Sequence, residues 1–395
     1  MKKIFMLAAM AATLMAVSCN RTQSPVTLNE EEDNSPVAVK FSANAAAVRG
    51  VTKAAVDEFT GAEVLYIYGL EGAWDKESGE FQPNGNILID NVAALSPVLA
   101  ATPSADIPDN MLKEGIEVWD PAYLPDEVPF FYGANGEVYN FYGYYVGNAF
   151  GAQTPAPDAD FALPVVFDGT QDIMLATTDR VADYEDRTGD FNEWTVYSAK
   201  AARKDVHPNL IFKHQLSRFV FQLQFRPVDR VDEAQNIQIT GISLVSPHNE
   251  VILDIDDQDA VFGGEETIFA LHNIGGDLYP NPDSNDITET GLINTTDWTQ
   301  AGESIMVAPG YPVYHMIMTY NYTYNGIALL NLPAFEWDID LPALLDEEEY
   351  VAEAGKKYIV KLVVYGPEEV KISVTLEDWD EIELPEIDPD AEPED

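Results

Sequence analysis

Apolar and polar residues alternate along most of the chain after residue 36. The first such run is Val37–Ala43, in which Val37, Val39, Phe41 and Ala43 fall on one face. Because successive side chains of a strand point to opposite faces, a period of two predicts a half-buried strand. The same period, between turns rich in Gly, Pro and Asn, predicts further strands at Val64–Tyr68, Ile87–Ile89, Val138–Val146, Val165–Phe167 and Ile173–Ala176.

The alternation changes phase near Ser217-Arg218. Even-numbered positions from Leu210 to Leu216 share one face, whereas from Phe219 to Phe225 the odd-numbered positions are apolar. A change of phase predicts either a bulge or a chain that passes from one sheet to another. Later strands are expected at Ile237–Ile239, Ile242–Val245, Val251–Ile255, Ile305–Val307, Val313–Tyr324 and Ile327–Leu332, and in a closing hairpin of Tyr358–Tyr365 and Val370–Leu376.

The pattern as a whole predicts an all-β protein with few or no helices, because helical periodicity is nearly absent and turn residues are frequent. The chain has 395 residues, and a single core rarely extends beyond roughly 250–300 residues. We therefore expect two β-sandwich domains in tandem. A stretch with little pattern ends near Pro208, which predicts an N-terminal domain of residues 50–208 and a C-terminal domain of residues 209–380.

The first 18 residues have the organisation of an export signal. Two lysines precede an apolar run from Ile4 to Val17, and small residues lead to Cys19. The run is too short to span a bilayer, so we expect residues 1–18 to be a signal peptide and Cys19 to carry a lipid. The alternative is an ordinary secretory signal that contains a cysteine. Cys19 is the single cysteine, so no disulfide framework is expected.

The charge balance limits the partners of this protein. The chain has 21 basic and 68 acidic residues, a formal net charge of −47. Such a surface repels phosphate backbones, which excludes nucleic acid as a partner. With 46% hydrophobic residues the chain can still build a core. The polar start of segment 19–49 reads as a tether, and the acidic residues 381–395 as a disordered tail.

No catalytic motif or cofactor site is visible in the sequence. There is no Gly-x-Ser-x-Gly elbow, no phosphate-binding glycine loop, and no metal-type spacing among the five histidines. Acidic residues cluster at Asp254–Asp259, with Glu265 at the twelfth position. Calcium is one interpretation of this cluster, but the glycine and the flanking helices of an EF-hand are missing. A solvated turn is the other. We expect no enzyme, no metal and no cofactor.

Aromatic residues are concentrated at Tyr139–Tyr145. Their rings alternate onto two faces, which favours a strand buried on one side with tyrosines on the other. An exposed sugar-binding platform is the alternative.

The chain resembles the Bacteroidales fimbrillins, or type V pilins, whose precursors are exported as lipoproteins. The signal ending at Cys19 and the first strand followed by Arg49 both match this family. The other matching elements are Val138–Tyr145, Asp172–Ala176, Phe212–Arg218, and Gly355–Tyr358 through Val374–Trp379.

This resemblance implies a transthyretin-like second domain and assembly by strand exchange with other fimbrial subunits. A trypsin-like protease would cut between Arg49 and Gly50, with Lys53 as the second choice, and remove the strand Val37–Ala43. Unpaired backbone groups beside exposed core would then accept a strand from a neighbour. Candidate donors are the tail around Ile382 and Leu384 or, as our first choice, the strand with Val370, Ile372, Val374, Leu376 and Trp379.

We therefore predict a structural subunit, or a tip or accessory adhesin, of fimbriae, whose precursor is anchored in the outer membrane by a lipid such as palmitate. The rival interpretation is a glycan-binding surface lipoprotein that is never cleaved and uses exposed aromatics such as Trp119, Tyr144 or Trp298. A third, an acid-base hydrolase on a β-scaffold, lacks a convergent site.

Overall fold

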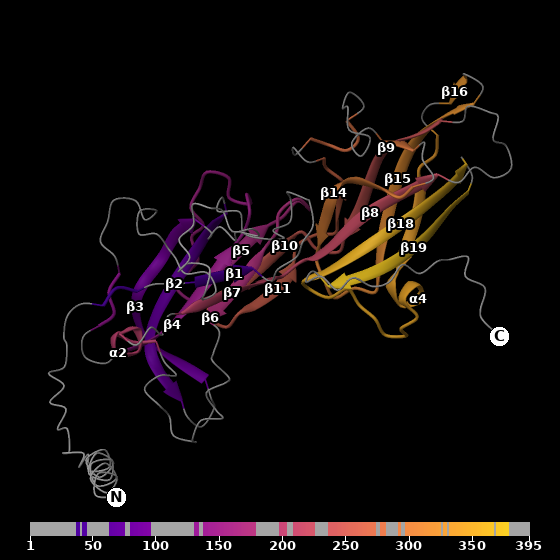
Figure 1. Cartoon of the computed structure of the whole chain (residues 1–395). Helices are drawn as coiled ribbons and strands as arrows, with labels where there is room; N and C mark the ends of the chain where they lie inside the picture. Colours follow the sequence, from indigo (N-terminus) through magenta and orange to yellow (C-terminus); the bar gives the residue numbers. More distant parts are fainter. Residues whose placement is uncertain are drawn as a thin grey trace, which may run out of the picture. The chain divides into compact units, whose positions relative to one another are not determined.

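The computed structural model (Figure 1) describes residues 37–39, 42–45, 63–75, 80–95, 130–133, 137–178, 197–203, 208–225, 236–273, 277–281, 291–293, 297–324, 327–329, 332–366 and 369–378. All of them belong to one compact unit, Val37–Asp395. The predicted all-β fold is confirmed: strands dominate the described ranges, with the short helices α2 (Ala199–Ala202) and α4 (Leu341–Leu345). Neither helix, nor any other in the described ranges, could cross a membrane.

The first sheet has six strands in the order β1-β7-β6-β4-β2-β3. Its neighbours are antiparallel except for β1 and β7, which run parallel. The strands are β1 (Ser42–Ala45), β2 (Val64–Asp75), β3 (Glu80–Leu95), β4 (Val138–Tyr145), β6 (Met174–Thr178) and β7 (Asn209–His214).

A three-stranded sheet combines residues from both halves of the chain. Its order is β11-β10-β5, with β5 (Ala162–Val166), β10 (Glu250–Asp254) and β11 (Asp259–Gly263). Residue 208, where the sequence predicts a domain boundary, lies between β5 and its partner β10, and the chain changes sheet after β7, at Gln215-Leu216. The boundary itself stays a prediction.

The C-terminal sandwich consists of two sheets. One has the order β14-β8-β18-β19, and the other has the order β12-β9-β15-β16, with β13 on β9 and β17 on β15. The expected closing hairpin is confirmed, because β18 and β19 are antiparallel neighbours. The strands are β8 (Ser217–Phe225), β9 (Asn236–Ser246), β12 (Thr267–Ala270), β13 (Leu292–Ile293), β14 (Thr299–Val307), β15 (Val313–Tyr324), β16 (Ile327–Leu329), β17 (Phe335–Asp340), β18 (Lys356–Gly366) and β19 (Glu369–Asp378).

The phase change near Ser217 is a passage between sheets and not a bulge within one strand. In β7, Leu210 and Phe212 are buried in a cluster on one face of the first sheet. In β8, Phe219 and Phe221 are buried in a second, larger cluster, which fills the C-terminal sandwich and also includes residues of the first and the three-stranded sheet. One continuous stretch of chain therefore supplies two cores.

Candidate functional site

The segment 37–45 closes one edge of the first sheet. Strand β1 lies beside β7 in parallel register, from Ser42 opposite Asn209 to Ala45 opposite Phe212. Upstream, Ala38 forms an antiparallel bridge with Phe131. The segment therefore pairs first with residues 130–132 and then with β7.

The described residues overlap the predicted strand Val37–Ala43. The structure has a bridge at Ala38 and a strand that begins at Ser42 and ends at Ala45. Ala43 lies within β1, whereas Lys40 and Phe41, between the bridge and β1, fall outside the described residues.

Residues 130–132 hold the segment through two backbone hydrogen bonds. The Val39 amide donates to the Phe130 carbonyl over 2.8 Å, and the Tyr132 amide donates to the Val37 carbonyl over 2.9 Å. The sequence analysis missed these residues. The signal was the aromatic run Phe130-Phe131-Tyr132, which is too short to show a period.

An apolar cluster lies under this edge. Val37 and Val39 are half-buried and pack against it, and Phe141 and Phe212 within it are fully buried. The packing is close, because a Cβ added at Gly143 would lie 2.9 Å from the Phe212 ring. Removal of segment 37–45 would therefore uncover core side chains as well as backbone groups.

Tyr132 belongs to the same cluster. Its ring lies 5.7 Å from that of Tyr139 and 6.2 Å from that of Phe141, measured between centroids. Burial raises the pKa of Tyr132 far above its ordinary value, so this phenol stays neutral at all physiological pH values.

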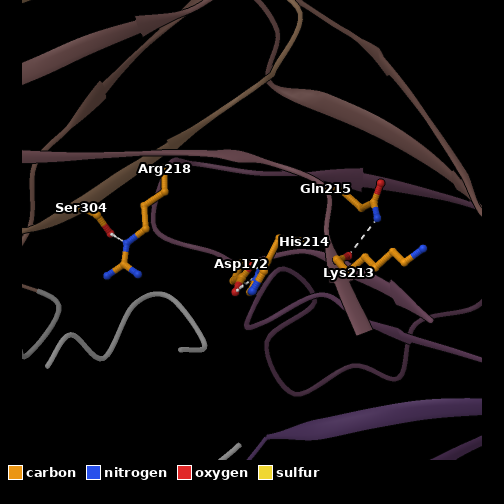
Figure 2. A network of polar contacts seen from close by, with 6 residues as sticks. All are labelled: Asp172, Lys213, His214, Gln215, Arg218 and Ser304. Carbon is orange, nitrogen blue, oxygen red and sulfur yellow. Dashed lines mark hydrogen bonds and ion pairs between the residues drawn. The ribbon is translucent and has the colours of Figure 1, made fainter. Parts of the chain in front are cut away.

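The inner end of β7 is fixed by a buried polar pair. His214 Nδ1 lies 3.0 Å from Asp172 Oδ1, and both side chains are almost completely buried (Figure 2). The next amide, that of Gln215, donates to the Ile173 carbonyl over 2.8 Å. His214 is therefore a hydrogen-bonded histidine of the core.

Polar contacts continue into the start of β8. Arg218 is buried, and its Nε donates to Ser304 Oγ over 3.3 Å (Figure 2). Ser217 Oγ donates to the Glu353 carbonyl over 2.8 Å. The crossing between the two sheets is thus held by contacts that do not involve β1.

The candidate donor strand is paired within its own sheet in this structure. Strand β19 forms a long antiparallel ladder with β18. Val374 is buried, and Ile372 and Leu376 are half-buried against the larger core cluster. Val370 lies in the ladder opposite Val364, whereas Trp379 falls outside the described residues.

The interpretation of Tyr144 as an exposed sugar platform is wrong. Tyr144 is fully buried, its ring stacks on Tyr66 with centroids 5.1 Å apart, and its hydroxyl donates to Asn91 Oδ1 over 2.6 Å. The reason is that β4 lies in the middle of the first sheet, with both faces covered. Trp298 is partly exposed, with Lys361 Nζ 5.6 Å from its ring centroid, and Trp119 lies outside the described residues.

The acidic cluster forms the turn between β10 and β11. The Asp257 amide donates to Asp254 Oδ1 over 3.2 Å, while the Glu265 amide bonds to Asn249 in another loop. Burial, with the hydrogen bond and charge of Asp254 as further causes, raises the pKa of Asp256 to about 6. Across the described ranges, no group of three or more acidic, histidine or cysteine side chains could hold a metal ion.

Several predicted site residues lie outside the described residues. They are the lipid attachment site Cys19, the processing site Arg49 and Gly50, and the second choice Lys53.

The sequence of this chain matches the model of a known protein family. The family model described as fimbrillin-like matches residues 101–379, well over half of the sequence. This chain belongs to the fimbrillin-like family. The predicted resemblance is thereby confirmed, and the role is fimbrial or adhesive, at the cell surface, and not enzymatic.

No curated protein matches the fimbrillin-like chain in sequence. Among solved structures, a protein assigned to cell adhesion from Bacteroides uniformis aligns with a TM-score of 0.48 and 14% identity, over 87% of this chain and 99% of its own. A protein from Bacteroides ovatus that is also assigned to cell adhesion aligns with a TM-score of 0.46 and 11% identity, over 87% of this chain and 98% of its own. A fimbrial protein from Bacteroides vulgatus aligns with a TM-score of 0.44 and 12% identity, over 87% of this chain and 99% of its own.

Proposed function

We propose that this fimbrillin-like chain is a structural subunit, or a tip or accessory adhesin, of cell-surface fimbriae that assemble by protease-triggered strand exchange. The precursor travels as an outer-membrane lipoprotein through Cys19. A trypsin-like protease then cuts after Arg49, with Lys53 as the second choice. The cut releases segment 19–49, including the strand that closes the first sheet.

The observation that carries this proposal is the edge formed by segment 37–45. The segment covers an apolar cluster through the half-buried Val37 and Val39, yet its ladder with β7 spans only four residues. Its departure would leave unpaired N–H and C=O groups on β7 and on residues 130–132. A strand from another subunit can satisfy both sets of groups and cover the apolar cluster.

The donor comes from the C-terminal end of a neighbouring subunit. Our first choice is β19 with Val370, Ile372, Val374 and Leu376, followed by Trp379, and the alternative is the tail around Ile382 and Leu384. Alternate side chains of either segment are apolar, which suits insertion into a groove with one apolar face. Such head-to-tail exchange does not close on itself and so produces a polymer.

Limited trypsin digestion tests the proposal. We expect digestion of a Cys19→Ser chain to produce a new N-terminus at Gly50, read by mass spectrometry, and SDS-resistant ladders on gels. Arg49→Ala combined with Lys53→Ala should suppress the ladders, whereas Lys53→Ala alone, the matched control, should leave them. Cleaved protein that stays monomeric at high concentration would rule out strand exchange.

A cross-strand disulfide tests the choice of donor. Lys361 and Ser373 lie directly opposite each other in the β18–β19 ladder. In the Cys19→Ser background, Lys361→Cys with Ser373→Cys should lock β19 in place and abolish the ladders until dithiothreitol is added. Ladders that persist in the oxidised protein would assign the donor to the tail instead.

A further inference from the structure

A pocket of about 320 Å³ lies between the first sheet and the turn that connects β10 with β11. One wall is formed by β4, β6 and β7, and the other by residues 256–258. We propose that this pocket, called the turn pocket below, binds one ring of a neutral sugar. Its size is at the lower end of the range of about 300–1,000 Å³ that is usual for small-molecule sites, which suits one ring better than a long chain.

The lining of the turn pocket combines polar groups with nearly as much apolar surface. Hydroxyl groups come from Tyr142, Thr177 and Thr178, and amide groups come from Asn140 and Gln258. Ile211 is the one aliphatic side chain in the lining. A ligand that fits such walls offers hydrogen-bonding groups beside apolar patches, as the hydroxyls and C–H faces of a sugar ring do. A fatty acyl chain has no hydrogen-bonding groups along its length and does not meet this requirement.

The charges of the turn pocket favour a neutral ligand. Lys213 supplies one ammonium group, and Asp256 and Asp257 supply two carboxylates. An anion would meet two carboxylates in a protein with a formal net charge of −47, and a cation would meet the Lys213 ammonium. A neutral polyhydroxylated ring can instead accept from Lys213 and donate to both aspartates.

The walls of the turn pocket are held in place by internal hydrogen bonds. The Thr178 hydroxyl donates to Asn140 Oδ1. Gln258 has a left-handed backbone conformation (φ 60°), and its side-chain amide donates to the Ile255 carbonyl over 2.5 Å. Because these groups are fixed before a ligand arrives, binding does not have to order them.

The placement of Lys213 follows from the alternation along β7. His214 turns into the core toward Asp172, whereas Lys213 is exposed, on the other face of the strand (Figure 2). A substitution of Lys213 therefore changes the turn pocket without opening the core. The sugar site is independent of segment 37–45, so its test is also independent of strand exchange.

Saturation-transfer difference NMR on the full chain with Cys19→Ser tests the proposal. The probes are D-glucose, D-galactose, D-mannose, L-fucose and N-acetyl-D-glucosamine, with N-acetylneuraminate as the anionic comparison. We expect at least one neutral sugar to bind with a Kd of about 1 mM, the order expected for about twelve non-hydrogen atoms. N-acetylneuraminate should bind more weakly than that sugar.

Two variants of the turn pocket have matched controls. Lys213→Met and Asp257→Asn should each weaken binding by about tenfold, because each removes a charged hydrogen-bonding group. Asp259→Asn removes a carboxylate of the same hairpin that does not line the pocket, and Trp298→Ala removes a partly exposed ring. Both controls should bind as the parent does.

Each result either supports or overturns the proposal. Thermal unfolding and near-ultraviolet circular dichroism verify that every variant is folded, and Lys213→Gln replaces Lys213→Met if the latter is not. No signal from any neutral sugar would overturn the proposal. So would binding that survives both pocket variants, or binding that Trp298→Ala abolishes, since the sugar would then be held elsewhere.

Discussion

Two sheets of this protein have edges that are closed in opposite ways. The edge of the first sheet is closed by β1, which shares four register pairs with β7 and runs parallel to it. The edge of a C-terminal sheet is closed by β19, which shares ten register pairs with β18 in an antiparallel hairpin. Parallel pairing is slightly less stable per residue, and a short ladder has fewer bonds to lose.

The sequences of the two edge strands reinforce this difference. Strand β1 reads Ser-Ala-Asn-Ala and has little side-chain area to bury, whereas β19 carries Ile372, Val374 and Leu376 toward the larger core. In addition, β19 begins three residues after the end of β18, while β1 and β7 are far apart in the sequence. The edge at β1 is therefore weakly attached, whereas the edge at β19 is part of the folded core.

If β19 is the donor, its release becomes the demanding step of assembly. The ladder with β18 must break before the strand can enter a neighbour. The groove that β1 leaves must then replace that ladder and the apolar contacts of β19. Segment 37–45 could control the availability of the groove, and the β18–β19 ladder could control the availability of the donor.

The largest loss of stability is expected when β19, the edge strand of the C-terminal sandwich, is removed. A chain that stops at Gly366 lacks β19 and leaves the buried side chains of β18 uncovered. Loss of the apolar contacts alone should lower the free energy of unfolding by roughly 4 kcal/mol. Urea denaturation followed by tryptophan fluorescence measures this change.

The matching truncation removes segment 37–45, including the weakly attached strand β1. A chain that begins at Gly50 loses the contacts of Val37 and Val39, two backbone hydrogen bonds with residues 130–132, and the four-residue ladder with β7. We expect it to lose only about 2 kcal/mol. Equal losses from the two truncations would mean that the two edges do not differ in strength, and the comparison would fail.

An effect smaller than the loss of β19 is expected at the inner end of β7. The comparison requires β7 to keep its place when β1 leaves, and the buried pair of His214 with Asp172 holds that end. His214→Ala leaves the Asp172 carboxyl buried without this partner, which should cost about 3 kcal/mol in chemical denaturation.

The neighbouring Gln215 provides the control for this prediction. Its side-chain amide donates to the Lys213 carbonyl over 2.9 Å at an exposed position (Figure 2). Gln215→Ala should change the stability by less than about 0.5 kcal/mol. If His214→Ala is equally mild, β7 depends on other contacts, and β1 becomes a candidate for the missing support.

The sequence pattern predicted the elements of the fold better than their partners. Alternation identified the strands and the closing hairpin, and the phase change near Ser217 located the passage between sheets. It did not predict that β5 pairs with β10, because periodicity records which face of a strand is buried and not which remote strand lies beside it.

Parts of the candidate site could not be predicted either, because alternation does not reveal which segments lie beside each other. Val37 and Val39 were recognised by their period, but their partners at residues 130–132 form too short a run to show one. Tyr144 illustrates a further limit: an aromatic strand that is covered on both faces has the same alternation as a half-exposed one. The sheet order that decides between the two is a property of the folded chain.

The smallest effect concerns the turn that faces the outward side of β7. The pKa of Asp256 rises from 3.8 to about 6, mainly through burial, and Asp254, Asp257 and Lys213 are the charged groups around it. The folded state therefore binds this proton more tightly than the unfolded state does. The resulting stability is fully present below about pH 3.8 and is lost as the pH rises through about 6.

Asp256→Asn should accordingly stabilise the protein at pH 7, where the ionised carboxylate is unfavourable, and lose this advantage by pH 4. The gain should be about 1 kcal/mol, because solvent at this partly exposed side chain reduces the effect. Urea denaturation at a series of pH values measures the difference, with Asp259→Asn as the control for charge removal in the same hairpin. An advantage of Asp256→Asn that does not vary with pH would show that the carboxyl does not titrate in this range.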